Sequence, residues 1–236
     1  MDLQLTPEQV FCNELLIQDN DCLVFIFCSD SFIAVESELK KLLSNDETER
    51  LLKFKFEKDR QTYCIAHGLK RVLLAALLNT KEQVEISTHS NGKPFINHKK
   101  HNMPLHFSLS HSEKMIALAF QKNSPLGVDI EKIQPADKYG NVIQHYFTSD
   151  EQKLISRSDN DIFFKIWTQK EAIGKATGQG IANLPEIVIP DDYELSTASL
   201  GGYILSTCFF RGNVISFKTI NVQDVLNQIN ILSLHP

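Results

Sequence analysis

The longest regular pattern in this sequence is helical and runs from about Lys58 to Leu78. Apolar residues recur there at the spacing of one helix face, as at Ile65, Leu69 and Val72. Strand-like segments lie before and after this helix, beginning with the apolar run Leu23–Phe27. Helices and strands are therefore mixed along the chain, which predicts an α+β fold.

The other predicted elements fall into two groups, which are separated by the turn-forming residues Asn123-Ser124-Pro125. Ser44 and Glu47 have the spacing of a capping box and predict the start of a helix. Further helices are predicted at Glu36–Leu43, Asp137–Tyr146, Ser149–Ser156 and Asp161–Ala176, and strands at Pro94–Ile96, His106–His111, Met115–Phe120, Leu126–Ile130, Glu186–Ile189, Tyr203–Phe210 and Val214–Ile220. We therefore expect two halves, residues 1–123 and 124–236, that each combine strands with helices.

Composition predicts a folded protein of the cytoplasm. Its 236 residues are 42% hydrophobic, which is enough to bury a core. No segment approaches the roughly 20 apolar residues that span a bilayer. The start of the chain also lacks the basic region of a secretory signal. These absences predict a cytoplasmic protein that does not associate with membranes.

Charge and cysteine usage argue against two further classes of function. The formal net charge is −5, whereas sequence-independent nucleic-acid binding needs a basic surface. The five cysteines form no C-x-x-C pair and no zinc spacing. We therefore predict reduced, buried thiols and no nucleic-acid partner.

Two carboxylates alternate along the predicted strand after residue 125. In a strand, Asp129 and Glu131 face one way, and Val128 and Ile130 face the other. Two adjacent carboxylates repel each other unless a cation lies between them or one is protonated. Magnesium prefers such hard oxygen ligands and completes its shell with water and phosphate. Taken alone, however, two solvated acids at a strand end are the stronger interpretation.

Glu171 and Lys175 are i,i+4 neighbours in a predicted helix. Such a pair is commonly a surface ion pair that contributes about 0.3–0.5 kcal/mol. Phe163 and Trp167 lie on the same stretch and indicate a partly buried face, which favours a functional site. Both interpretations stay open for this pair.

Ser110 and His111 end another predicted strand. A serine beside a histidine suggests a hydrolase, but adjacent strand residues point to opposite faces, and the chain has no G-x-S-x-G motif. Phosphate binding suits this pair better, with a structural turn as the alternative. Gly174-Lys175-Ala176-Thr177 lacks the spacing of a phosphate loop, and the histidines lack zinc-binding spacing.

Taken together, three of these segments resemble the Sfp-type 4′-phosphopantetheinyl transferases. Phe107–Ser112, Gly127–Glu131 and Trp167–Lys175 match F-S-x-S-H, G-[IV]-D-[IL]-E and W-[ST]-x-K-E-[AS]-x-x-K in the order and spacing of that family. The resemblance also includes Leu51–Arg71 and Asn91–Pro94 and covers roughly residues 44–181. Each motif alone is weak, but three in register are specific.

The resemblance implies a pseudo-two-fold pair of α/β halves with coenzyme A between them. It also implies transfer of the 4′-phosphopantetheine group of coenzyme A to a serine of an apo acyl or peptidyl carrier protein. Asp129, Glu131 and Glu171 correspond to the Mg²⁺ ligands of the family. Glu171 also corresponds to the general base, and Lys175 to a catalytic lysine near the departing group.

The resemblance further implies which residues contact coenzyme A. Lys93, Ser110 and His111 correspond to residues that hold its phosphates, as does Lys175. Arg50 stands where the family has a basic residue that meets the 3′-phosphate. The N-terminal half would then supply the coenzyme A contacts, and the C-terminal half the magnesium site and the catalytic helix.

Two positions depart from the family pattern. Many relatives have a basic residue at the position of Glu47 and an arginine at that of Thr62, so affinity for the 3′-phosphate or adenine is expected to differ. We expect a monomer, because the two halves would complete one site. Two rivals remain: a coenzyme A-binding sensor without transfer activity, and a magnesium-dependent phosphotransferase that acts on a nucleotide.

Overall fold

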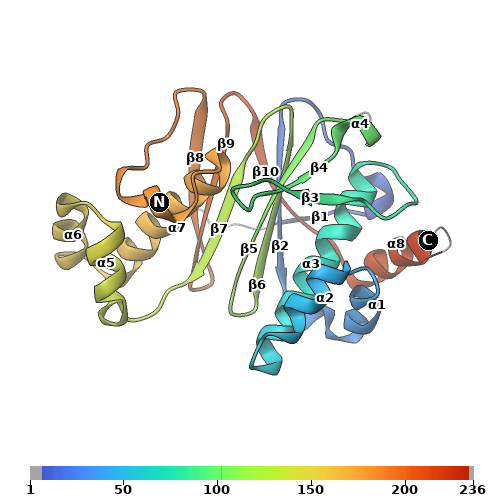
Figure 1. Cartoon of the computed structure of the whole chain (residues 1–236), viewed down its shortest axis with the longest axis horizontal. Helices are drawn as coiled ribbons and strands as arrows, with labels where there is room; N and C mark the ends of the chain where they lie inside the picture. Colours follow the sequence, from blue (N-terminus) through green and yellow to red (C-terminus); the bar gives the residue numbers. More distant parts are fainter. Residues whose placement is uncertain (1–6, 102, 234–236) are drawn as a thin grey trace.

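The structure is a computed structural model that describes residues 7–101 and 103–233. Helices and sheets are mixed throughout it, as predicted for an α+β protein. Figure 1 shows two groups of helices on opposite sides of a central set of strands. None of the described helices is long and apolar enough to cross a membrane.

The larger sheet has five strands and includes segments from both ends of the chain. In spatial order its strands are β1 (Glu8–Gln9), β10 (Val214–Thr219), β2 (Asp21–Cys28), β6 (Met115–Lys122) and β5 (Leu105–Ser112). β5 and β6 form the predicted hairpin, with Phe107 opposite Phe120. β10 runs parallel to β2, and Phe217 lies opposite Val24.

Helices on one side of this sheet bury its core (Figure 1). They are η1 (Cys12–Glu14), η2 (Ser29–Val35), α1 (Glu36–Lys40), α3 (Glu57–Leu77) and α8 (Val222–Ser233). α2 (Asn45–Leu52) packs on α3 and buries Leu51 in a separate small cluster. α3 is the predicted long helix, and its Ile65, Leu69 and Val72 are fully buried. They belong to one apolar cluster with Phe25 and Phe120 of the sheet.

The smaller sheet has three antiparallel strands. Its order is β7 (Gly127–Lys132), β9 (Tyr203–Phe210) and β8 (Tyr193–Leu200). The elements around it are η3 (Ala136–Tyr139), α5 (Gly140–Tyr146), α6 (Ser149–Ser156), α7 (Asn160–Thr177) and η4 (Ile181–Glu186). α7 packs on β7 and β9 and carries Phe163 and Phe164 into a separate aromatic cluster.

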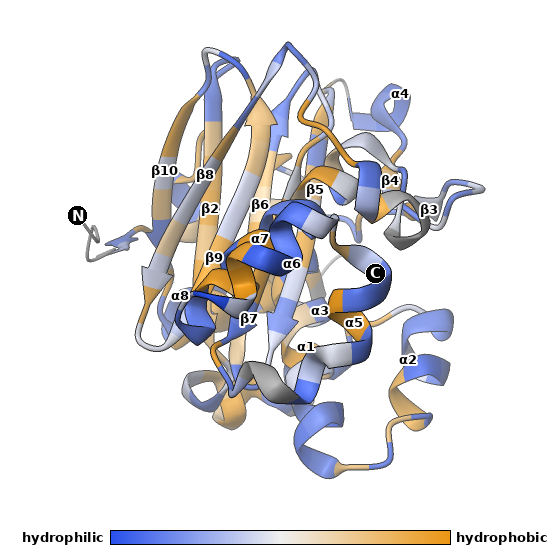
Figure 2. Ribbon diagram, turned by 90° about the vertical axis from the view of Figure 1, so that its left-hand side faces the viewer, coloured by the Kyte–Doolittle hydropathy of each residue, from blue (hydrophilic) through white to orange (hydrophobic). Residues whose placement is uncertain are grey.

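Serine side chains join the two sheets where β5 passes β7. The Ser108 hydroxyl oxygen accepts a hydrogen bond from the Val128 amide at 3.0 Å, and the Ser112 hydroxyl oxygen accepts one from the Lys132 amide at 3.2 Å. A separate hairpin of β3 (Ile86–Thr88) and β4 (Pro94–Ile96), followed by α4 (His98–His101), lies near the start of β5. In Figure 2 the strands carry much of the hydrophobic colour, whereas the outer helix faces are hydrophilic.

Most predicted elements are confirmed, and the capping box of Ser44 and Glu47 is present at the start of α2. The prediction of a strand at Glu186–Ile189 is wrong, because η4 extends to Glu186 and the next strand, β8, begins only at Tyr193. β8 and α8 were not predicted. All five cysteines are free thiols and four are buried, as predicted.

The division into residues 1–123 and 124–236 stays a prediction. Although β10 and α8 come from the later part of the chain, β10 pairs with β2 and α8 packs on α3. The chain thus returns to the first sheet after building the second.

Candidate functional site

A glycine allows helix α7 to lie closely against strand β7. A Cβ atom placed on Gly127 would lie 1.9 Å from the Ala172 carbonyl oxygen and 2.7 Å from the Ala176 amide nitrogen. Only glycine allows two backbones to approach so closely. This contact sets Glu171 and Lys175 of α7 beside Asp129 of β7.

Asp129 lies at the centre of the resulting cluster and is 3% exposed. Its Oδ1 atom accepts hydrogen bonds from the Ser110 hydroxyl and from the Lys175 ammonium, each at 2.7 Å. Its Oδ2 atom is buried and has no hydrogen-bond partner. A buried, unpaired carboxylate oxygen is costly, so this atom is suited to a further donor or a cation.

Two more carboxylates lie near Asp129. Glu131 accepts a hydrogen bond from the Ser112 hydroxyl at 2.6 Å. Burial, with added repulsion from Asp129 and Glu171, raises the pKa of Glu131 to about 7. Burial also raises the pKa of Glu171, an effect that Lys175 opposes. The three acids therefore share a region in which negative charge is poorly compensated.

A cavity of about 710 Å³ opens beside this cluster, a size typical of small-molecule sites. Six of the eight residues that the sequence singled out line it: Arg50, Lys93, Ser110, His111, Glu171 and Lys175. Asp129 and Glu131 are not part of its lining, but Asp129 is hydrogen-bonded to lining residues. The structure thus brings together segments that are far apart in the sequence.

Lys93 holds the turn before β4 against the end of α7. Its ammonium donates to the carbonyl oxygens of Lys175 at 2.6 Å, Ala176 at 3.0 Å and Leu126 at 3.3 Å. Burial lowers the pKa of Lys93 to about 8. All three of its donors are engaged, so a phosphate would have to replace these bonds. Its role as a phosphate contact stays a prediction.

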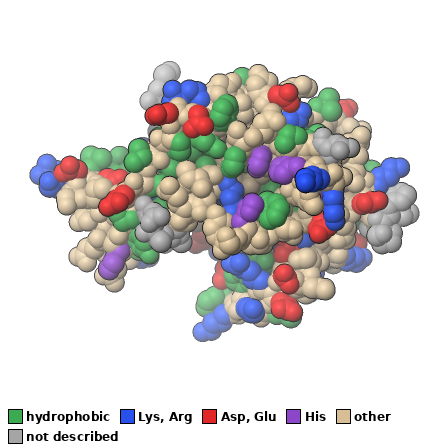
Figure 3. Space-filling view, turned by 45° about the horizontal axis from the view of Figure 1, so that its top comes forward, with side chains coloured by type: hydrophobic (Ala, Val, Ile, Leu, Met, Phe, Trp, Pro, Cys, Tyr) green, Lys and Arg blue, Asp and Glu red, His purple; other side chains and the backbone are tan. Residues whose placement is uncertain are grey.

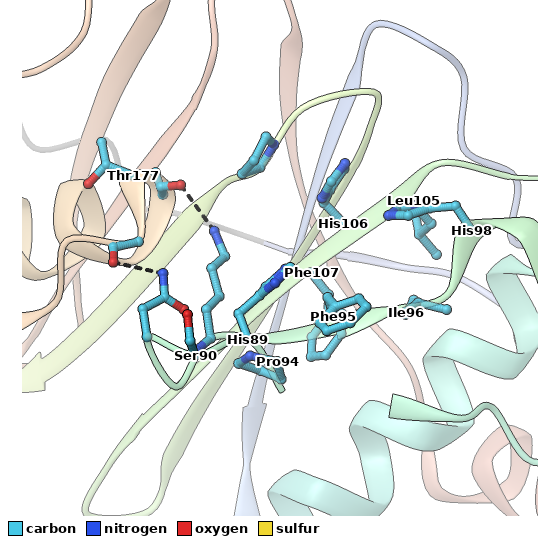
Figure 4. Close-up of a pocket in the computed structure, with 15 residues that line it drawn as sticks. His89, Ser90, Pro94, Phe95, Ile96, His98, Leu105, His106, Phe107 and Thr177 are labelled. Atoms are coloured by element: carbon cyan, nitrogen blue, oxygen red, sulfur yellow. Dashed lines mark hydrogen bonds between the residues drawn. The ribbon is translucent and has the colours of Figure 1, made fainter. Parts of the chain in front are cut away.

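The same turn also lines a second cavity, of about 530 Å³ (Figure 4). Rings of His89, Phe95, His98 and His106 line one end of it, and the end of α7 lines the other. Figure 3 shows histidine side chains gathered beside lysines on this face of the molecule. Burial lowers the pKa of His106 to about 4, so this imidazole is uncharged at neutral pH.

Sequence reasoning missed some residues of the site. Ser108 and Ser112 belong to the seam between the sheets, and their alternation with Ser110 along β5 was the available signal. Phe54, Tyr63 and His67 line the end of the large cavity near Arg50. They lie in the segment Leu51–Arg71 that resembles the family, but none was predicted as a site residue. Tyr63 stacks on His67, with ring centroids 4.0 Å apart, and lies tilted against Phe54, with centroids 5.1 Å apart.

The two departures from the family pattern have structural roles. Glu47 forms ion pairs with Lys70 and Arg71, and its side chain is largely buried. Thr62 is 3% exposed, and its hydroxyl donates to the Glu113 carbonyl oxygen at 3.2 Å.

The carboxylate oxygens are suitable ligands for a hard cation, although their side chains are not arranged as a metal site in this structure. Among the residues that the structure describes, no three His, Cys, Asp or Glu side chains are arranged to hold a metal ion. Lys175 instead pairs with Asp129. The unpaired Asp129 oxygen and the raised pKa of Glu131 nevertheless indicate that added positive charge would stabilise this cluster.

Comparison with known proteins shows related families for both parts of the chain. Residues 125–224 match the family described as "4′-phosphopantetheinyl transferase superfamily", and residues 34–123 match "4′-phosphopantetheinyl transferase, N-terminal". The chain is 34% identical to the 4′-phosphopantetheinyl transferase HetI of Nostoc sp. over 162 residues, which cover 65% of this chain and 68% of HetI.

Two Bacillus proteins show similar identity. The chain is 31% identical to the 4′-phosphopantetheinyl transferase ffp of Bacillus subtilis over 158 residues, which cover 59% of this chain and 67% of ffp. It is also 31% identical to the 4′-phosphopantetheinyl transferase psf-1 of Bacillus pumilus over 150 residues, which cover 61% of this chain and 62% of psf-1. The matched regions thus span roughly two thirds of these relatives.

Proposed function

This chain belongs to the 4′-phosphopantetheinyl transferase superfamily, and we propose that it transfers phosphopantetheine from coenzyme A to a serine of an apo acyl or peptidyl carrier protein. The other product is 3′,5′-ADP. Family membership confirms the resemblance seen in the three sequence motifs.

One observation carries the proposal. The three motifs lie on β5, β7 and α7. Polar residues of β5 and α7 line one cavity of about 710 Å³, and Asp129 of β7 is hydrogen-bonded to two of them, Ser110 and Lys175. The cavity offers a carboxylate, Glu171, and an ammonium, Lys175, on adjacent turns of one helix. A phosphoryl transfer needs this pairing of a proton acceptor with positive charge.

We propose the following roles for the residues of the chain. Glu171 accepts the proton of the carrier serine, and its raised pKa brings it closer to the working pH than an exposed acid. The serine oxygen then forms a bond to the β-phosphorus of coenzyme A while the bond from that phosphorus to 3′,5′-ADP breaks. Lys175, at the cavity wall, stabilises the negative charge of the phosphoryl oxygens. Ser110 orients Asp129 through its hydrogen bond.

We propose that Mg²⁺ is held by Asp129, Glu131 and Glu171, whose oxygens suit this ion. When bound, it would supply positive charge to the phosphoryl group. Ser110 and Ser112 hold the first two carboxylates in place. We also propose the pseudo-two-fold arrangement, with the halves meeting near residue 124. A monomer in the cytoplasm stays a prediction.

A coenzyme A-binding protein without transfer activity is the second candidate. The Lys175–Asp129 ion pair favours it, because Lys175 already neutralises part of the acidic cluster without a metal ion. Binding alone, however, gives no reason to keep three carboxylates in a desolvated region.

Mass spectrometry of a purified apo acyl carrier protein separates the two candidates. We expect incubation with this protein, coenzyme A and Mg²⁺ to add one phosphopantetheinyl group, and a chelator to prevent it. A peptidyl carrier protein is tested in parallel. If coenzyme A binds but neither carrier gains the group, the binding-protein interpretation is correct.

A pair of variants tests the assigned base. Glu171→Gln removes the carboxylate and is expected to slow transfer by about 10²–10⁴-fold. Glu186→Gln makes the same change at an exposed position just beyond α7 and serves as the control. Equal rates for Glu171→Gln and the wild-type protein would contradict the assignment.

A further inference from the structure

The large cavity has few positively charged groups that are free to meet a phosphate. Coenzyme A carries two phosphates in its diphosphate bridge and a third on the 3′ position of its ribose. Among the described lining residues, Lys93 donates only to backbone carbonyls and Lys175 pairs with Asp129. Arg50 is exposed at the cavity edge and has no side-chain partner among the described residues.

Two more cations lie close to the Arg50 end of the cavity, but Glu47 neutralises them. Its Oε1 atom lies 2.5 Å from the Lys70 ammonium, and its Oε2 atom lies 2.9 Å from Nε of Arg71. The same carboxylate lies 3.1 Å from Nδ1 of His67, which lines the cavity. Lys70 and Arg71 are 4% and 8% exposed. Neither can therefore turn toward a ligand while Glu47 is ionised.

Glu47 stays ionised across the physiological range. Burial alone would raise its pKa, but hydrogen bonds from His67 and Lys70 and the charge of Lys70 outweigh this effect and hold the pKa well below its usual range. The carboxylate also accepts the Ser44 amide at 2.8 Å as part of the capping box of α2. The helix cap thus fixes Glu47 in the position where it binds both cations.

The same end of the cavity is lined by rings. Tyr63 stacks on His67 and lies tilted against Phe54, and all three rings line the cavity near Arg50. Burial lowers the pKa of His67 to about 4, so its imidazole is uncharged. Tyr63 is 3% exposed, so the partly exposed rings of Phe54 and His67 are the ones that can stack on a planar base. This end is therefore better suited to a nucleobase than to a cluster of phosphates.

We propose that Phe54, His67 and Arg50 bind the adenosine end of the donor, and that Glu47, by neutralising two nearby cations, makes the 3′-phosphate nearly dispensable. A donor without that phosphate, 3′-dephospho-coenzyme A, is then bound and used nearly as well as coenzyme A. The inference rests on the proposed function and specifies the donor for the same site. Glu47 is a specificity-determining residue in this scheme.

Calorimetric titration of the wild-type protein with the two donors provides the main test. Two freed cations would favour the 3′-phosphate by about 100-fold, whereas one exposed guanidinium is expected to favour it by less than about tenfold. We therefore expect the two dissociation constants to differ by less than about tenfold. A preference for coenzyme A of about 100-fold or more would overturn the inference.

Glu47→Gln tests the assigned residue, and Glu49→Gln, at an exposed position on the same helix, is the control. Removing the charge of Glu47 leaves the charges of Lys70 and Arg71 uncompensated beside the cavity, so the preference for coenzyme A should rise by at least about tenfold. The control should keep the wild-type preference. A folded Glu47→Gln protein with an unchanged preference would refute the role of Glu47. If this variant does not fold, the wild-type comparison decides.

The assay also separates failure of the inference from failure of the proposed function. If the wild-type protein binds and transfers from coenzyme A alone, the function stands and the inference is wrong. If it binds neither donor, the proposed function fails, and the inference fails with it. Transfer from both donors at similar rates supports both.

Discussion

Replacing Gly127 by alanine tests whether the contact between β7 and α7 builds the site. The new Cβ atom would lie 1.9 Å from the Ala172 carbonyl oxygen, whereas ordinary contacts begin at 3.4 Å. One backbone must therefore move by about 1.5 Å, and neither obstacle is a flexible side chain. The shift would carry Glu171 and Lys175 away from Asp129.

The expected cost has two parts. Overpacking of this kind lowers the free energy of unfolding by about 1–3 kcal/mol. A displacement of about 1 Å at a catalytic group also slows a reaction by about 100-fold. We therefore expect Gly127→Ala to lose transfer activity even at temperatures at which it remains folded.

Urea unfolding and carrier modification by mass spectrometry measure the two effects. Gly140→Ala is the matched control, because a Cβ atom there meets nothing within 4 Å and the residue already has helical dihedral angles. It should be neutral or stabilise by up to about 1 kcal/mol. If Gly127→Ala equals the wild-type protein in both assays, the close approach does not shape the site, and the reasoning is wrong.

Three further predictions concern the charges of the site. Lys175→Met leaves the buried Asp129 without its counter-charge and should lower the free energy of unfolding by about 3 kcal/mol. In thermal melts, millimolar Mg²⁺ should recover part of this lost stability. The pKa of Glu131 is raised to about 7 from 4.5, so the folded metal-free protein binds a proton that the unfolded chain has released. Its stability should therefore fall by at most about 3 kcal/mol as pH rises from about 5 to 8 in urea titrations, and Glu131→Gln should flatten this slope. Lys93→Met leaves three carbonyl oxygens without a donor and should lower the free energy of unfolding by about 2–3 kcal/mol, measured as a lower melting temperature. Lys99→Met, at an exposed position, should leave the melting temperature unchanged.

Local patterns were sufficient for most of the fold. The helical spacing of Ile65 and Leu69 predicted α3, a continuous apolar run predicted β2, and strand-like patterns predicted β5, β6 and β9. The strand prediction at Glu186–Ile189 failed where Pro185 and Pro190 flank the segment. α8 was missed although Val222, Val225 and Ile229 have helical spacing, because the residues before it alternate like strands.

The sequence by itself determined which groups are available for chemistry: carboxylates at alternate positions of a strand, and an acid and a lysine one helical turn apart. These relations depend only on local periodicity. Only the tertiary structure decided how the groups are used. It left the Asp129 Oδ2 atom without a partner, engaged Lys93 with backbone carbonyls, and paired Glu47 with Lys70 and Arg71. Burial and long-range contacts determine whether a charge is free, and neither can be read from the spacing of residues along the chain.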